Sequence, residues 1–125
     1  METTIMLVDD SEICNLMMKK VLSRQPMPLK VYDFTEPVVA FSQLKQINPS
    51  VLFLDLNMPD LDGWGFLELM RDSGLTNRVI ILTSSTSQLD RVRCAEFPNV
   101  VAYHTKPLSH DMVRSLMASL QPELS

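Results

Sequence analysis

Hydrophobic residues in this chain fall into five short runs, and longer segments with helical spacing of apolar residues separate them. Most of the runs are rich in β-branched residues, which is typical of strands buried on both faces of a sheet. In the second run apolar residues alternate with Lys30 and Asp33, which predicts a strand at the sheet edge. The runs are Ile5–Val8, Leu29–Phe34, Val51–Leu54, Val79–Leu82 and Val100–Tyr103.

The segments between the runs predict amphipathic helices whose apolar stripes face a core. Weaker patterns follow Gly63 and cover Ser87–Phe97. The three clear stripes are Ile13, Leu16, Met17 and Val21; Val38, Phe41 and Leu44; and Met112, Val113, Leu116, Met117 and Leu120.

Helix start signals and turn residues punctuate this pattern. Thr35 precedes Glu36-Pro37 and Ser109 precedes His110-Asp111, so both are predicted N-caps. Asp60, Asp62 and Gly63 predict a turn followed by a helix start. Before the fifth run, Asn99 is expected to adopt a left-handed turn conformation, which asparagine tolerates better than most residues.

Strands and helices alternate five times, which predicts an α/β fold with a doubly wound, five-stranded parallel sheet and helices on both faces. Right-handed crossovers leave few topologies, and the flavodoxin-like strand order 2-1-3-4-5 is one common solution. Periodicity alone does not select that order. The length of 125 residues predicts one domain spanning residues 1–125.

Composition excludes several classes of function. The net charge is −4 and no cluster of Lys or Arg is present, which argues against binding to nucleic acid. The apolar runs are too short to span a membrane, and no signal peptide is recognisable. Cys14 and Cys94 have no metal-ligand spacing, so they are interpreted as reduced thiols of a cytoplasmic protein.

Polar side chains follow the carboxyl ends of the predicted strands. Asp9 and Asp10 end the first, Asp55 the third and Thr83 the fourth, and Lys106 comes shortly after the fifth. In open parallel sheets, ligands bind beyond these ends, at the point where the strand order reverses. With the order 2-1-3-4-5, the three carboxylates would converge at that point.

Three carboxylates in one pocket repel each other unless a cation offsets their charge. Hard oxygen ligands of this kind suit Mg²⁺, which also binds phosphate oxygens. Lys106 supplies a positive charge and Thr83 a hydroxyl donor, both of which stabilise a phosphoryl group. Aspartate is a known nucleophile in phosphoryl transfer, so Asp55 is the candidate phosphoacceptor.

Four motifs resemble the landmarks of response-regulator receiver domains, and the resemblance covers essentially the whole chain. They are LVDDS at Leu7–Ser11, LDLNMPDLDG at Leu54–Gly63, ILTSS at Ile81–Ser85 and YHTKP at Tyr103–Pro107. The resemblance implies the strand order 2-1-3-4-5. It also implies a phosphorelay or two-component signalling protein whose only catalysis is its own phosphorylation and dephosphorylation.

The same resemblance implies roles for individual residues. Asp55 would accept a phosphoryl group from a phosphohistidine on a sensor kinase or phosphotransfer protein. Asp9 and Asp10 would bind Mg²⁺ together with Asp55, and Asn57 would add its backbone carbonyl. Thr83 would donate to one phosphoryl oxygen.

Three further implications concern the fifth strand and the output. Lys106 would pair with another phosphoryl oxygen, and the bond from it to Pro107 would be cis. Tyr103 would change rotamer with the Thr83 hydroxyl. The final helix is expected to end near Leu120, so we expect a stand-alone, monomeric receiver that signals to a downstream protein target.

Three alternatives remain at this point. A non-phosphorylated pseudo-receiver would act only as a docking module, although the full set of motif residues argues against it. A flavin-binding protein would need a loop that cradles phosphate, where Asp9 and Asp10 would repel one. Aspartate-nucleophile phosphatases place a second Asp two residues after the nucleophile, where this chain has Asn57.

Overall fold

The protein, described here from a computed structural model, alternates strands and helices along the chain. The structure describes residues 2–84 and 87–124, with side chains as far as Leu120. The strands are β1 (Thr3–Val8), β2 (Leu29–Phe34), β3 (Val51–Asp55), β4 (Arg78–Thr83) and β5 (Val100–Thr105). The helices are α1 (Glu12–Ser23), α2 (Pro37–Ile47), α3 (Gly63–Asp72), α4 (Gln88–Arg93) and α5 (His110–Leu124), and a 3₁₀ turn, η1 (Cys94–Glu96), follows α4.

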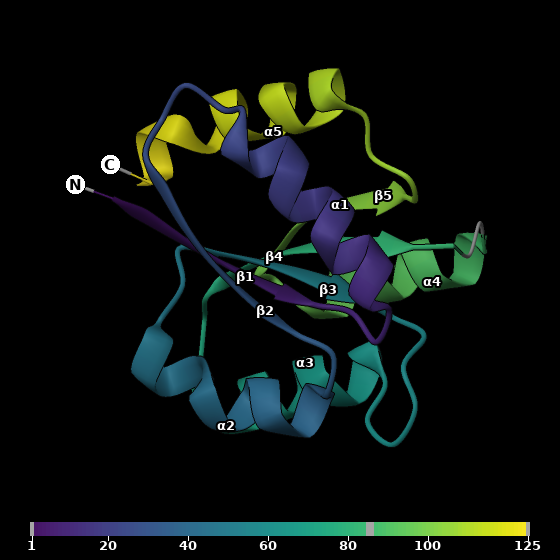
Figure 1. Cartoon of the computed structure of the whole chain (residues 1–125). Helices are drawn as coiled ribbons and strands as arrows, with labels where there is room; N and C mark the ends of the chain where they lie inside the picture. Colours follow the sequence, from purple (N-terminus) through teal and green to yellow (C-terminus); the bar gives the residue numbers. More distant parts are fainter. Residues whose placement is uncertain (1, 85–86, 125) are drawn as a thin grey trace.

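The strands form one parallel sheet in the order β2-β1-β3-β4-β5. Helices α1 and α5 cover one face, and α2 and α3 cover the other (Figure 1). The doubly wound α/β fold and the flavodoxin-like strand order are therefore confirmed, as is the edge position of β2. Because β1 and β3 are neighbours but not consecutive, their carboxyl ends mark the point where the strand order reverses.

Two apolar cores form because successive strand residues point to opposite faces of the sheet. In β1, Met6 and Val8 pack toward α2 and α3, while Ile5 and Leu7 pack toward α1 and α5. Every residue of β3 is buried, which explains why its sequence is a continuous apolar run up to Asp55.

The predicted core stripe of α1 is wrong at three of its four residues, while Val21 packs against the core as predicted. Ile13, Leu16 and Met17 are 69%, 53% and 54% exposed, whereas Asn15 is buried. The Asn15 amide donates to the carbonyl oxygens of Asp9 (3.1 Å) and Phe34 (3.2 Å). These carbonyls lie just past β1 and at the end of β2, so the helix turns a polar residue inward to satisfy them.

Helices α2 and α5 also differ in part from their predicted stripes. Val38 and Met112 are exposed, while Leu44, Val113 and Met117 are buried as predicted. The orientation of each helix on the sheet decides which of these residues are buried. The apolar stripe predicted from the sequence is wider than the face of the helix that the sheet covers.

The predicted helix caps and turn residues had mixed outcomes. Ser109 Oγ accepts from the Met112 amide at 3.2 Å, which confirms that cap. Thr35 is not a cap, because α2 begins one residue later with Glu36 in the N-cap position. Asn99 is not left-handed either. Its side-chain amide instead donates to the Asn77 carbonyl at 3.1 Å, and that bond fixes the turn.

Two other expectations concern features outside the sheet. Both Cys14 and Cys94 are free thiols, as predicted. Among the described residues, none of the helices combines the length and apolar character that crossing a membrane requires.

Candidate functional site

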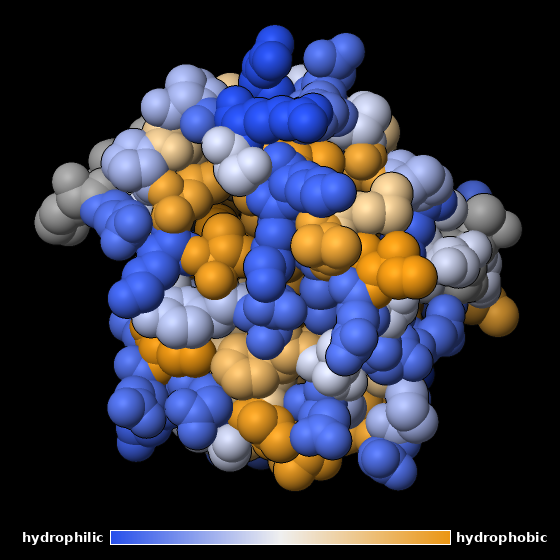
Figure 2. All heavy atoms as spheres, viewed as in Figure 1, coloured by the Kyte–Doolittle hydropathy of each residue, from blue (hydrophilic) through white to orange (hydrophobic). Residues whose placement is uncertain are grey.

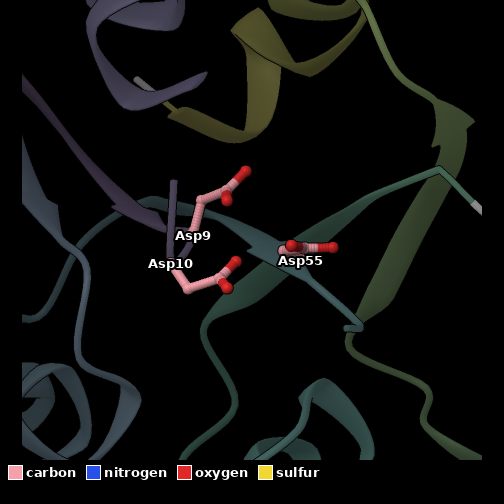
Figure 3. Close-up of side chains that lie close together, drawn as sticks. All are labelled: Asp9, Asp10 and Asp55. Atoms are coloured by element: carbon pink, nitrogen blue, oxygen red, sulfur yellow. The ribbon is translucent and has the colours of Figure 1, made fainter. Parts of the chain in front are cut away.

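Three carboxylates meet where β1 and β3 end. Asp9 and Asp10 directly follow β1, and Asp55 is the last residue of β3. Each can offer one oxygen such that all three oxygens lie within 4.8 Å of one another (Figure 3). Asp9 and Asp55 are buried, while Asp10 is exposed to solvent. The predicted convergence of the three side chains is therefore present in the structure.

The backbone around Asp9 is fixed by the start of α1. Asp9 Oδ1 accepts a hydrogen bond from the Ser11 amide at 2.9 Å. Ser11 in turn caps the helix, because its Oγ accepts from the Cys14 amide at 3.2 Å. Asn15, which sequence reasoning missed, holds the Asp9 carbonyl from inside the helix. The sequence signal for the buried position of Asn15 was its place as a polar residue within the predicted apolar stripe.

Lys106 bridges two of the three carboxylates. Its Nζ lies 2.5 Å from Asp9 Oδ2 and 3.3 Å from Asp55 Oδ2. The Lys106 amide also donates to the Thr83 carbonyl at 2.8 Å, which holds the chain after β5 against the end of β4. The following bond to Pro107 is cis, as expected from the resemblance.

Burial and charge shift the acid–base equilibria of this pocket. Burial raises the pKa of Asp55 above its ordinary value, and the neighbouring Asp9 acts in the same direction. Lys106 and the Asn57 amide oppose the shift without cancelling it. Burial alone would lower the pKa of Lys106, but its hydrogen bond to Asp9 and the charges of Asp55 and Asp9 together raise it. The Lys106 ammonium is therefore firmly charged, and the ionised form of Asp55 calls for further positive charge.

The donor set fits a small divalent cation. The carboxylate oxygens of Asp9, Asp10 and Asp55 are hard ligands of the kind that Mg²⁺ prefers, and the exposure of Asp10 leaves room for water. An ion held there would supply the charge that the raised pKa of Asp55 calls for. The backbone carbonyl of Asn57 stays a predicted fourth ligand.

The loop after β3 brings Asn57 between the ends of two strands. Its backbone amide donates to Asp55 Oδ1 at 3.2 Å. Its side-chain Nδ2 donates to Oγ1 of Thr83, the fully buried last residue of β4, at 3.3 Å. The predicted site residues Asp55, Asn57 and Thr83 are therefore linked directly.

The same loop ends at a close backbone contact. Asp62 caps α3 by accepting from the Gly65 amide at 2.8 Å, and Asp60 has a positive φ of 68°, so the predicted turn and helix start are confirmed. A Cβ on Gly63 would lie 2.7 Å from the Asp55 carbonyl oxygen and from the Leu56 Cα. Helix α3 can therefore begin directly against the end of β3 only with glycine at this position.

Tyr103 belongs to β5, which is two strands away from β3 in the sheet. It sits in β5 beside Ile81 of β4, and its ring packs against the core on the α2 and α3 face. The Arg91 guanidinium of α4 stacks 4.8 Å from the centre of the ring. The contact between Arg91 and Tyr103 could not be predicted from the sequence, because it depends on how the short helix α4 packs against β5.

Comparison with known proteins identifies the family of the chain. Residues 5–118 match the family described as "Response regulator receiver domain". The chain is 36% identical over 85 residues to a protein-glutamate methylesterase/protein-glutamine glutaminase of Xanthomonas campestris, covering 67% of this chain and 23% of that protein. The chain spans between 22% and 30% of the length of the curated relatives of this kind that it matches.

Solved structures show the same fold. The response regulator domain of Thermotoga maritima CheB superposes with a TM-score of 0.79 at 23% identity, covering 99% of this chain and 96% of that one. The Mn(2+)-bound form of response regulator Rcp1 gives a TM-score of 0.79 at 26% identity, covering 93% and 92%. With the family match over most of its length, the chain belongs to the response-regulator receiver domains of two-component signalling.

Proposed function

We propose that this receiver accepts a phosphoryl group on Asp55 from a phosphohistidine. The observation that carries the proposal is a buried Asp55 carboxylate that meets Asp9, Asp10 and Lys106 at one strand edge. In the reaction a carboxylate oxygen of Asp55 bonds to phosphorus as the P–N bond of the donor breaks. The bonding electrons leave with the imidazole nitrogen, which then takes a proton from solvent.

The neighbouring side chains have separate roles. Lys106, already 3.3 Å from the Asp55 carboxylate, pairs with an oxygen of the phosphoryl group. Thr83 donates its hydroxyl proton to another of these oxygens. Asp9, Asp10 and Asp55 hold Mg²⁺, whose charge offsets that of the carboxylates and the phosphoryl group. The similar response regulator Rcp1 has a Mn(2+)-bound form, which supports binding of a divalent ion by a protein of this fold.

Phosphorylation acts by population shift. A phosphoryl group that pairs with Lys106 and Thr83 favours the conformation in which both approach it, and Tyr103 follows the space that Thr83 leaves. The output contact then forms on the surface around Tyr103, α4 and α5, with a downstream protein target. We propose a monomer in both states, and a place in the cytoplasm stays a prediction.

The exposed side of α1 supports a docking site for the kinase or phosphotransfer protein. Ile13, Leu16 and Met17 are exposed there, and Figure 2 shows hydrophobic side chains at the surface over α1. A groove of about 360 Å³ runs between α1 and the loop after β5 and reaches Asp9 and Lys106. A partner seated on this surface would bring its phosphohistidine to the open side of the carboxylates.

Incubation with acetyl phosphate and Mg²⁺, followed by intact mass measurement, tests the central step. We expect one added phosphoryl group on the wild-type protein and none on Asp55→Asn. Asp72→Asn, which changes an exposed aspartate of α3, is the matched control and should be labelled like the wild type. Wild-type labelling of Asp55→Asn would refute the assignment, and a wild-type protein that is never labelled would favour the pseudo-receiver alternative.

A further inference from the structure

Asn57 contacts the phosphoacceptor region through two different groups. Its backbone amide bonds to the Asp55 carboxylate, while its side-chain Nδ2 bonds to the Thr83 hydroxyl oxygen at 3.3 Å. The side chain itself is exposed at the surface, but Thr83 is fully buried. One surface residue therefore connects the carboxylate at the end of β3 with the hydroxyl at the end of β4.

The chemistry of the Thr83 side chain makes this bond directional. A threonine has few χ1 rotamers, and rotation exchanges the positions of its hydroxyl and its methyl group. A carboxamide N–H can bond only to the hydroxyl oxygen, so it favours the rotamer with Oγ1 toward the loop after β3. The hydroxyl oxygen accepts this bond with one lone pair, so the bond from Asn57 does not use the hydroxyl proton of Thr83.

We infer that the Asn57 carboxamide is a positioning residue that orients the Thr83 hydroxyl toward the phosphoryl site on Asp55. This inference rests on the proposed function and adds a role separate from the backbone carbonyl of Asn57. The carboxamide donates to Oγ1 while the hydroxyl donates to a phosphoryl oxygen, and each bond of such a chain strengthens the other. Asn57 thereby tunes the rate of phosphorylation through Thr83.

A purely structural role for the Asn57 side chain makes a different expectation. If the bond only secured the loop after β3, removing it would lower stability and displace the Asp55 carboxylate whether or not Thr83 carried a hydroxyl. If the bond orients Thr83, its removal matters only while that hydroxyl exists. A double-mutant cycle between Asn57 and Thr83 separates the two cases.

The experiment measures the rate of labelling by acetyl phosphate and Mg²⁺ for Asn57→Ala, Thr83→Val and the double variant. We expect Asn57→Ala to label about fivefold to tenfold more slowly, the loss of one hydrogen bond. In the Thr83→Val background the same change should have no further effect. Asn99→Ala is the matched control, because it removes one asparagine hydrogen bond at the opposite end of the sheet and should label normally.

A second measurement does not depend on phosphorylation. Three-bond scalar couplings report the χ1 rotamer of Thr83, which should be single in the wild type and averaged in Asn57→Ala. Equal slowing by Asn57→Ala in both Thr83 backgrounds, or an unchanged Thr83 rotamer, overturns the inference and leaves the proposed function intact. If the wild type is never labelled, the proposed function fails instead, and the rotamer comparison still decides whether Asn57 orients Thr83.

Discussion

Helices α3 and α4 are attached to the same domain in opposite ways. Five residues of α3 are buried, whereas none of the residues of α4 is. Helix α4 is held by side chains that lie over aromatic rings: Arg91 stacks on Tyr103, and Arg93 lies 4.6 Å from the ring centre of Trp64. An ion pair of 3.4 Å from Arg93 to Glu68 of α3 adds to this.

The difference in burial fits the role that the proposed function gives to each helix. Helix α3 starts against the carbonyl of Asp55, the proposed phosphoacceptor, so the burial of the helix fixes the backbone at that residue. Helix α4 follows the end of β4, where Thr83 would move on phosphorylation. An element with few buried apolar contacts rearranges at low free-energy cost. On the proposed function, the domain thus joins a rigid side that carries Asp55 to an output side that is easily displaced.

The largest expected contrast comes from one leucine in each helix. Leu67 of α3 is buried and Leu89 of α4 is 81% exposed. Leu67→Ala should lower the free energy of unfolding by about 3 kcal/mol, because it leaves a cavity in the core. Leu89→Ala should change it by less than about 0.5 kcal/mol. Urea unfolding of both variants measures this, and equal losses would refute the contrast.

Next in size is the backbone contact at the start of α3. Gly63→Ala should cost about 2 kcal/mol of unfolding free energy, because the new methyl group meets backbone atoms that cannot yield. Gly65→Ala is the control within the same helix. There the methyl group meets the flexible end of the Leu61 side chain, so we expect no loss and a gain of up to about 1 kcal/mol. A Gly63→Ala protein as stable as the wild type would show that α3 can shift.

The burial of Asp55 at the end of β3 predicts that its charged form lowers the free energy of unfolding. Since burial raises the pKa of Asp55, its stabilising contribution is complete below the ordinary value of 3.8 and is lost as the pH rises through the raised pKa. Asp55→Asn removes that loss and should add about 1 kcal/mol of unfolding free energy at pH 7. Thermal unfolding at pH 7 and pH 3 checks this, because the advantage of the variant should shrink at pH 3.

A smaller effect is expected where α4 contacts β5. Arg91→Ala removes the cation–π contact with Tyr103 and should cost about 0.5 kcal/mol. A double-mutant cycle with Tyr103→Leu isolates this contact, since Arg91→Ala should then have little effect. Additive losses would mean that α4 is held by other contacts.

The smallest expected effect is a pH dependence in β5. Burial, aided by the charge of Arg91, lowers the pKa of His104. The neutral imidazole therefore contributes stability that is present above pH 6.5 and is lost as the pH falls through the lowered pKa. Between pH 7.5 and pH 5, the free energy of unfolding should fall less for His104→Gln than for the wild type. The difference should be under about 0.5 kcal/mol, because solvent screens this partly exposed group. Identical pH profiles for both proteins would contradict this.

The sequence predicted the strands and the carboxylate cluster because both follow from simple rules. Continuous apolar runs marked the buried strands, and Asp55 at the end of one run had to meet the carboxylates that end its neighbour. The resemblance to receiver domains supplied the strand order that periodicity could not. Fold and cluster could therefore be predicted without any side-chain geometry.

The faces of the helices could not be predicted in the same way. Hydrophobicity assigned Ile13 and Leu16 to the core, but the need of two strand-end carbonyls for a donor turned Asn15 inward instead. The contact of Asn57 with Thr83 was missed for a related reason. It joins a loop to a neighbouring strand, and no spacing within either segment encodes the meeting of the two side chains.

The ammonium group of Lys106 that bridges Asp9 and Asp55 has a consequence for how a cell can use this protein. Its positive charge is part of the chain, so it is in place as soon as the domain folds. Folding should then not depend on the supply of divalent ions, unlike that of small domains built around a metal. On the proposed function, a shortage of Mg²⁺ would prevent phosphorylation while the receiver domain stayed folded. The folded protein could then be phosphorylated as soon as Mg²⁺ became available again.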